Sequence, residues 1–362
     1  MRELKILVIV VIVIGVIYWG VEPLAHSVMH PKVAPAEFDF VASGKNDVFD
    51  LKQLVKKADA NLKSAQKSGN QLNIERAQKE LDKAQENLAN LDGFWSKMDL
   101  KNGNAEEGKQ IFVENCNSCH TVKSQPDLAA RSTEQSDEEV SQAYGVIPPD
   151  LSTVAAVLDH NFLAHFIKNP ILASKLWHKE DLVYPMSGYD WLGDEAIGNI
   201  VAYLSSIAPK EISDKEVFEQ ACLRCHSVNY DKLTSPSVIG DLNRYLGARS
   251  YIYFYMSSNS STDDLERYLG ARAPDLSMMI RARGEDYLYK FMNDPQKLLP
   301  GTSMPRLGLT KEAEEKVINY LNEVGDTKKE QRESLGWKIM LFFGIMAVLA
   351  YLWKRKIWAE LH

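Results

Sequence analysis

The pentapeptides Cys116-Asn-Ser-Cys119-His120 and Cys222-Leu-Arg-Cys225-His226 contain all four cysteines of this 362-residue chain. Two cysteines separated by two residues and followed at once by histidine form the attachment signature of c-type haem. The two thiols make thioethers with the porphyrin, and the histidine binds iron from the same face. Zinc binding or thiol redox chemistry would be the alternative, but no further cluster of cysteine and histidine supports it. The sequence therefore predicts two covalently bound haem c groups, one on each pentapeptide.

The chain around the two motifs repeats one order of landmarks. Each motif is followed by a Pro-Asp-Leu-Ser segment, then by a loop methionine beside proline, and then by a segment that ends in Tyr-Leu. Asp150 and Asp275 precede Leu-Ser as the first residue of a helix often does, so each is expected to begin a middle helix. The repeat predicts an all-α protein with two tandem haem domains, over residues 100–208 and 211–326.

The loop methionines are the candidates for the sixth ligand of each iron. Met186 lies in Tyr-Pro-Met-Ser-Gly and Met304 in Thr-Ser-Met-Pro-Arg, which are loop sequences rather than core segments. A thioether in this position closes the iron to other ligands and raises its reduction potential. We expect Met186 at the first iron and Met304 at the second. Three histidines are the alternative ligands of the first iron: His160, His165 and His178.

Other residues near the motifs are candidates for the haem pocket. Arg272, Arg281 and Arg283 surround the second Pro-Asp-Leu-Ser, where a guanidinium could pair with a haem propionate. A solvated basic face is the alternative reading. Pro149 and Pro274 are expected to shape the haem edge. The acidic residues within 134–139 form either a solvated loop or a surface that steers a basic partner.

Both ends of the chain carry an apolar run, over residues 6–21 and 335–353. Runs of this length predict a membrane anchor at each end, over residues 1–22 and 335–356. A cleaved signal peptide is the alternative for the first run. Basic residues lie outside both runs, so both termini are expected in the cytoplasm and the haem domains in the bacterial periplasm.

Residues 47–95 carry no haem signature. Their apolar residues recur at alternating spacings of three and four, as in a coiled coil, and Lys67-Ser-Gly-Asn70 interrupts the pattern with turn residues. This predicts a hairpin of two helices, serving either as a docking arm for a partner subunit or as a spacer or a brace on a haem domain. The net charge of −7 argues against a nucleic-acid partner.

The second half of the chain resembles cytochrome c1 of the bc1 complex (quinol–cytochrome c reductase). The likeness covers about residues 211–360 and rests on the haem motif through Tyr230, on Ala273-Pro-Asp-Leu-Ser277, on Arg281-Ala-Arg-Gly-Glu-Asp-Tyr-Leu-Tyr289, on Ser303-Met-Pro305 and on the tail 331–358. Residues 100–326 also have the landmark order of the class I cytochrome c fold. The first haem domain and the hairpin depart from cytochrome c1, so the whole chain resembles the two-haem c1-like subunits of some bacterial bc1 complexes, including those of epsilonproteobacteria.

This resemblance implies a direction of electron flow. The second haem would accept an electron from the Rieske iron–sulfur protein, and the first would relay it to a cytochrome c or a terminal oxidase. Cytochrome b and the Rieske subunit would be partners in a dimeric complex of the inner membrane. The chain would transfer electrons without catalysis of its own. The alternatives are a two-haem subunit of a haem–copper oxidase, a dihaem peroxidase, or the cytochrome subunit of a membrane dehydrogenase.

Overall fold

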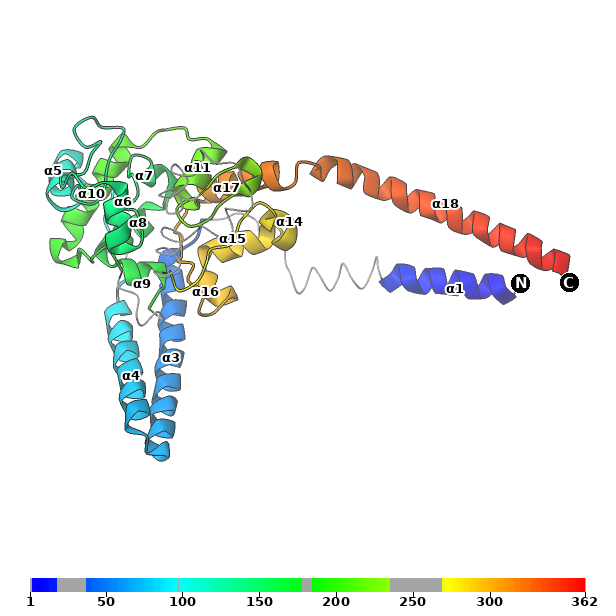
Figure 1. Cartoon of the computed structure of the whole chain (residues 1–362), viewed down its shortest axis with the longest axis horizontal. Helices are drawn as coiled ribbons and strands as arrows, with labels where there is room; N and C mark the ends of the chain where they lie inside the picture. The colour runs from blue at the N-terminus through cyan, green and yellow to red at the C-terminus, as the bar shows by residue number, and fades with distance from the viewer. Residues whose placement is uncertain (1, 18–36, 97, 178–183, 235–268, 362) are drawn as a thin grey trace, which may run out of the picture.

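The computed structural model describes residues 2–17, 37–96, 98–177, 184–234 and 269–361 and is mostly helical, with no strand in those ranges. This confirms the all-α prediction for that part of the chain. Figure 1 shows a helical body, a two-helix arm that leaves it, and two long helices that extend from another side. The body contains α5 (Ala105–Asn115), α6 (Asp137–Tyr144), α7 (Val154–Val157), α8 (His160–Lys168), α9 (Pro170–Ser174), α10 (Gly193–Ile207), α11 (Asp214–Ala221), α14 (Met279–Arg283), α15 (Glu285–Asn293), α16 (Pro295–Leu298) and α17 (Lys311–Gly325), with the 3-10 turns η2 (Asp190–Leu192) and η3 (Asn229–Asp231).

Each half of the sequence repeat buries a hydrophobic core of its own among the described residues. In the first, α5 packs on α10 and buries Phe112 against Tyr203, with ring centroids 5.6 Å apart. In the second, α11 packs on α17 and buries Phe218 against Tyr320 at 4.6 Å. In each half, therefore, the helix that enters the haem motif packs on the last helix of its own repeat.

The two halves are joined through their backbones. Residues 157–159 run antiparallel to residues 308–310, with hydrogen bonds from the Asp159 amide to the Gly308 carbonyl (2.8 Å) and from the Thr310 amide to the Val157 carbonyl (3.0 Å). The Val157 side chain, from the first half, is buried in the core of the second. The two halves thus pack as one body.

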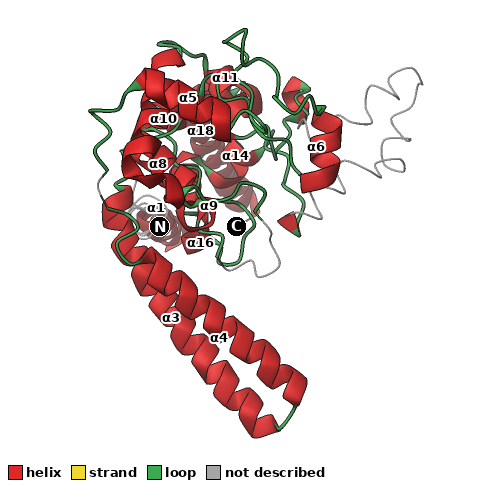
Figure 2. Ribbon diagram, turned by 90° about the vertical axis from the view of Figure 1, so that its left-hand side faces the viewer, coloured by secondary structure: helices red, strands yellow, loops and turns green. Residues whose placement is uncertain are grey.

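The arm consists of α3 (Phe40–Ser68) and α4 (Gln71–Leu91), joined at Gly69, whose φ of 69° is a left-handed conformation that suits glycine. Figures 1 and 2 show its outer part projecting from the body. The two helices bury Ala58, Leu62, Ala77 and Leu81 against each other. α3 begins at Phe40, before the expected start at residue 47, because the Asp39 carboxylate caps it by accepting from the Ala42 amide at 2.9 Å.

The two ends of the chain form α1 (Arg2–Val16) and α18 (Lys329–Leu361), whose large apolar side chains are mostly exposed. They lie beside each other, and the Lys354 ammonium is 3.6 Å from the Glu3 carboxylate (Figure 1). Within the described ranges, no helix is both long enough and apolar enough to cross a membrane. The membrane spans expected over residues 1–22 and 335–356 are therefore not confirmed, and residues 1 and 18–22 lie outside the described ranges.

Candidate haem-binding sites

The first motif forms a tight turn at the end of α5. The Cys116 amide donates to the Phe112 carbonyl at 2.8 Å, and the Cys119 and His120 amides donate to the Cys116 carbonyl at 3.1 and 2.8 Å. Because Phe112 is fully buried in the first core, it holds the start of the turn in place. The turn therefore follows directly from a buried helix end.

The second motif has the same turn. The Cys222 amide donates to the Phe218 carbonyl at 2.8 Å, and the Cys225 and His226 amides donate to the Cys222 carbonyl at 3.1 and 2.9 Å. Phe218 is also fully buried. All four cysteines are free thiols, so each turn offers the two sulfur atoms that haem attachment requires.

Both histidines are oriented by a carbonyl oxygen. His120 Nδ1 lies 3.0 Å from the Pro149 carbonyl oxygen, and His226 Nδ1 lies 2.8 Å from that of Pro274. A carbonyl can only accept, so each Nδ1 carries the proton and each Nε2 keeps its lone pair. A histidine that binds metal through one ring nitrogen commonly donates the other N–H to such a partner. The residues of both turns therefore fit covalent haem with histidine on the iron.

Burial supports this protonation state. It lowers the pKa of His120 to about 4 and also lowers that of His226, although the Pro149 and Pro274 carbonyls oppose the shift. Burial also raises the pKa of the Cys116 and Cys222 thiols to about 12. Because burial lowers the pKa of both histidines, both imidazoles are neutral at pH 7, as metal ligation requires.

The Pro-Asp-Leu-Ser segments hold the chain that follows each histidine. The Asp150 carboxylate accepts from the Lys123 amide and the Asp275 carboxylate from the Asn229 amide, both at 2.9 Å. The expectation that these aspartates begin the middle helices was wrong. α7 and α14 begin later, at Val154 and Met279, with Thr153 and Met278 at the cap positions and no side-chain cap, while each aspartate carboxylate is bound to the loop beside the histidine.

The carbonyls of Pro149 and Pro274 orient the two histidines, and the expected place of these prolines at the haem edge remains a prediction. The neighbouring backbones make the same bonds in each half: the Leu151 amide donates to the Thr121 carbonyl, and the Leu276 amide to the Ser227 carbonyl, both at 2.9 Å. Each segment is thus fastened beneath its own motif.

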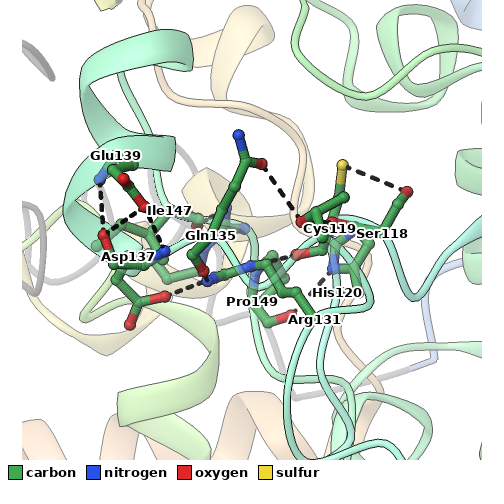
Figure 3. A network of polar contacts seen from close by, with 12 residues as sticks. Ser118, Cys119, His120, Arg131, Gln135, Asp137, Glu139, Ile147 and Pro149 are labelled. Atoms are coloured by element: carbon green, nitrogen blue, oxygen red, sulfur yellow. Dashed lines mark hydrogen bonds and ion pairs between the residues drawn. The ribbon is translucent and has the colours of Figure 1, made fainter.

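A buried arginine braces the first motif. Arg131 is 8% exposed and donates from Nε to the Cys119 carbonyl at 2.8 Å and from a terminal nitrogen to the Gln135 carbonyl at 3.1 Å. Figure 3 shows it between the first motif and the segment that leads into α6. It also pairs with Asp137, and Glu139 closes a capping box with Ser136 at the start of α6. Part of the acidic segment 134–139 is therefore structural. No local pattern could identify Arg131, whose partners are set by the fold of the loop.

The expected methionine ligands lie on loops that are held differently. Met186 is half-buried against the first core, and the nearby Tyr189 amide donates to the Ile167 carbonyl at 3.0 Å. Met304 is half-buried, and its amide donates to the Thr302 hydroxyl at 3.3 Å. Their assignment to the two irons remains a prediction.

The alternative histidine ligands of the first iron have other neighbours. His160 Nε2 lies 3.0 Å from the Ala155 carbonyl oxygen. His165 is fully buried and stacks on Trp95 at the base of the arm, with ring centroids 4.8 Å apart. His178 lies outside the described residues. These contacts favour Met186 over His160 and His165 as a ligand.

The three candidate pocket arginines have exposed side chains. Arg281 Nε lies 4.0 Å from a carboxylate oxygen of Asp326, and the Arg283 guanidinium lies 5.3 Å from the ring centroid of Tyr287. Arg272 also takes part in a polar or electrostatic contact. Their pairing with haem propionates remains a prediction.

The two motifs lie close to each other. Arg224, inside the second pentapeptide, donates to the Ile147 carbonyl beside the first Pro-Pro-Asp at 3.3 Å. Burial is the main cause of the lowered pKa of His120, and the Pro149 carbonyl opposes it. The nearby positive charge of Arg224 lowers this pKa further. Tyr184, two residues before Met186, is near both Arg224 and Cys225, and burial raises its pKa to about 12. The first ligand loop thus borders the second motif.

The comparisons with known proteins agree with part of this picture. The cytochrome c family matches residues 105–208. No curated protein matches the chain. A chain of a solved structure described as "Hyperthermophilic respiratory Complex III" is 28% identical over 41% of this chain and 75% of its own length, with a TM-score of 0.30, which does not establish a common fold.

The family match begins at the first residue of α5 and ends just after α10, so it spans the first core and the first haem motif. It shows a cytochrome c domain around the first motif, which implies at least one covalent haem c. Residues 105–208 of this chain form a cytochrome c domain.

Proposed function

We propose that the chain is a two-haem cytochrome that serves as the electron-transfer subunit of a bc1-type quinol–cytochrome c reductase. Electrons enter at the second haem, on Cys222, Cys225, His226 and Met304. They leave from the first, on Cys116, Cys119, His120 and Met186. The chain performs no catalysis of its own.

The observation that carries this proposal is the equivalence of the two motifs. Each histidine follows a turn of the same hydrogen bonds, and each directs Nδ1 at a proline carbonyl and leaves Nε2 with its lone pair. The family match covers the first motif alone, so the second is assigned by this shared geometry.

When bound, haem c supplies reversible one-electron chemistry. The chain's residues hold the two sites at a fixed separation. The backbone bonds between residues 157–159 and 308–310 fix one half against the other, and Arg224 of the second motif donates to the Ile147 carbonyl, two residues before Pro149. Two sites held in this way suit transfer between them without a diffusing carrier.

The complex and the direction of flow rest on the resemblance of residues 211–360 to cytochrome c1. By that resemblance the partners are cytochrome b and a Rieske iron–sulfur protein in a dimeric complex, with a cytochrome c or a terminal oxidase downstream. The proposal places the haem domains in the periplasm, at the inner membrane. α1 and α18 lie beside each other and expose many apolar side chains, which supports contact of these two helices with the membrane.

Haem counting and purification of the native complex test the assignment. We expect two covalent haems per chain by haem-staining and mass measurement, and one in the Cys222→Ser/Cys225→Ser variant. We also expect cytochrome b and a Rieske protein to copurify. A single haem in the wild type, or copurification with oxidase subunits alone, contradicts the proposal.

The order of the two haems has its own test. Met186→His should lower the potential of the first haem by about 0.1 V or more, since axial ligands tune haem potentials over about 0.8 V. Rapid-mixing spectroscopy should then show unchanged reduction of the second haem by the Rieske protein and slower onward transfer. Equal slowing of both steps would reverse or remove the proposed order.

A further inference from the structure

A buried ionic cluster lies immediately after the Met304 loop. The Arg306 side chain is fully buried, and its two terminal nitrogens donate to the two oxygens of the Asp47 carboxylate at 2.8 and 2.9 Å. One of them also lies 3.4 Å from Asp294. Asp47 belongs to α3 at the base of the arm, so this fork-to-fork contact fastens the loop to the arm.

Lys175 completes the cluster. Its ammonium is 3.0 Å from a carboxylate oxygen of each of Asp47, Asp50 and Asp294. Asp47, Lys175 and Arg306 are buried, and Asp294 is nearly so, which gives two positive and two negative charges inside the protein; Asp50 is about half exposed. Removing one partner from a buried ion pair is strongly destabilising, so each charged group of this cluster depends on the others.

The cluster joins three distant parts of the chain. Asp47 comes from the arm, Lys175 follows α9 in the first half, and Asp294 and Arg306 come from the second half. The Arg306 guanidinium also lies over the ring of Trp95, 5.9 Å from its centroid, at the other side of the arm's base.

The backbone of Arg306 is held as firmly as its side chain. Its amide donates to the Ser174 carbonyl at 3.0 Å, and two residues later Gly308 accepts from the Asp159 amide at 2.8 Å. Met304 stands two residues before Arg306, a reach of about 7 Å for an extended chain. The position of the Met304 backbone is therefore restricted, because Met304 lies only two residues from the fixed Arg306.

The contact between Asp47 and Arg306, here called the clamp, has no counterpart among the described residues of the first half. Gly188 occupies the position two residues after Met186, and a Cβ there would lie 2.8 Å from the Lys168 carbonyl oxygen. That loop is positioned by close backbone approach, without a buried charge.

We propose that Arg306 is a positioning residue for the iron ligand Met304, and that Asp47 at the base of the arm locks it in place. The arm thereby controls the axial ligation of the second haem and leaves that of the first untouched. This inference rests on the proposed function, in which Met304 binds the second iron. It assigns the base of the arm the role of a brace.

The test measures axial ligation and potential for each haem in the full chain. In Asp47→Asn and in Arg306→Met we expect the methionine-to-iron charge-transfer absorption of the oxidised protein to fall by half. We also expect a lower potential for the second haem alone. Arg306→Lys keeps the charge but loses the two-pronged bond, so its effect should be smaller in the same direction. Asp59→Asn is the matched control on α3, because Asp59 pairs only with the exposed Lys63 within the contacts described, and it should change neither readout.

A double variant separates positioning from folding. Asp47→Leu/Arg306→Met removes both charges, which restores stability in many buried pairs. We expect it to be more stable than Arg306→Met while the second haem keeps its lowered potential. Recovery of the potential together with stability would overturn the inference, as would equal shifts of both haems in Asp47→Asn.

Met304→His distinguishes this inference from the proposed function. If that variant leaves the potential of the second haem unchanged, the ligand assignment fails and the clamp fails with it. If it lowers the potential but the Asp47 and Arg306 variants do not, the clamp alone is wrong.

Discussion

The two halves of the body share the hydrogen bonds of their haem motifs and differ in what surrounds them. At three equivalent positions the second half buries or nearly buries a charged or ionisable group where the first does not. Gly188 corresponds to Arg306, Asn169 to Asp294 and Ile197 to Glu314. Asn169 only caps α9, whereas Asp294 pairs with Lys175. The difference teaches that attachment geometry is local to each motif, while the environment of the second site depends on the arm and on the first half.

The largest expected effect tests whether the halves unfold together. Phe112→Ala and Phe218→Ala each remove a fully buried ring that packs on the last helix of its half, so each should cost about 3–5 kcal/mol of unfolding free energy. Because the halves share a core residue and a backbone bridge, denaturant titration followed at both haems should show one common transition in either variant. Separate transitions for the two haems would mean that the halves are independent.

A second prediction concerns the buried carboxyl that stands where the first half has Ile197. Burial raises the pKa of Glu314 to about 8 from 4.5, so the folded state holds its proton more tightly than the unfolded state. Stability from this group is full below pH 4.5 and is lost as the pH rises toward 8. At about 1.4 kcal/mol per pKa unit, and with some water entering as the carboxyl ionises, the loss should be on the order of 3 kcal/mol.

Glu314→Gln should remove this pH dependence, which chemical denaturation at pH 5 and pH 8 would measure. Ile197→Val, in the first half, is the matched control; it should lower stability by the same amount at both pH values. An unchanged pH profile in Glu314→Gln would show that another group carries the dependence.

The smallest effect compares two capping boxes of the same geometry. Ser136 caps the N-terminus of α6, whose first residue Asp137 pairs with Arg131 beside the first motif. Ser213 caps α11, which leads into the second motif. Ser→Ala at either position should cost about 1 kcal/mol. The Ser213 change should also weaken hydrogen-exchange protection along α11, and the Ser136 change that of α6. Loss of protection at both helices from one substitution would indicate coupling beyond the local cap.

The helical class and the cytochrome c domain followed from sequence because each depends on residues close together in the chain. The Arg306–Asp47 contact did not, since its partners are 259 positions apart and nothing near either residue signals the other. The two aspartates of Pro-Asp-Leu-Ser misled for a related reason. A carboxylate before a helix usually caps it, but here the loop beside the histidine takes it first. Pro149 and Pro274 are expected at the haem edge, but that their carbonyls orient the histidines depends on the fold and not on the residue type.

The bridge between residues 157–159 and 308–310 makes the spacing of the two sites insensitive to most mutation. Its bonds run from the Asp159 and Thr310 amides to backbone carbonyls, so the identity of the side chains hardly matters to them. Among natural amino acids only proline lacks the donor. The surface of each half can therefore diversify while the distance between the two cysteine motifs stays constant, which the proposed transfer between two haems would need.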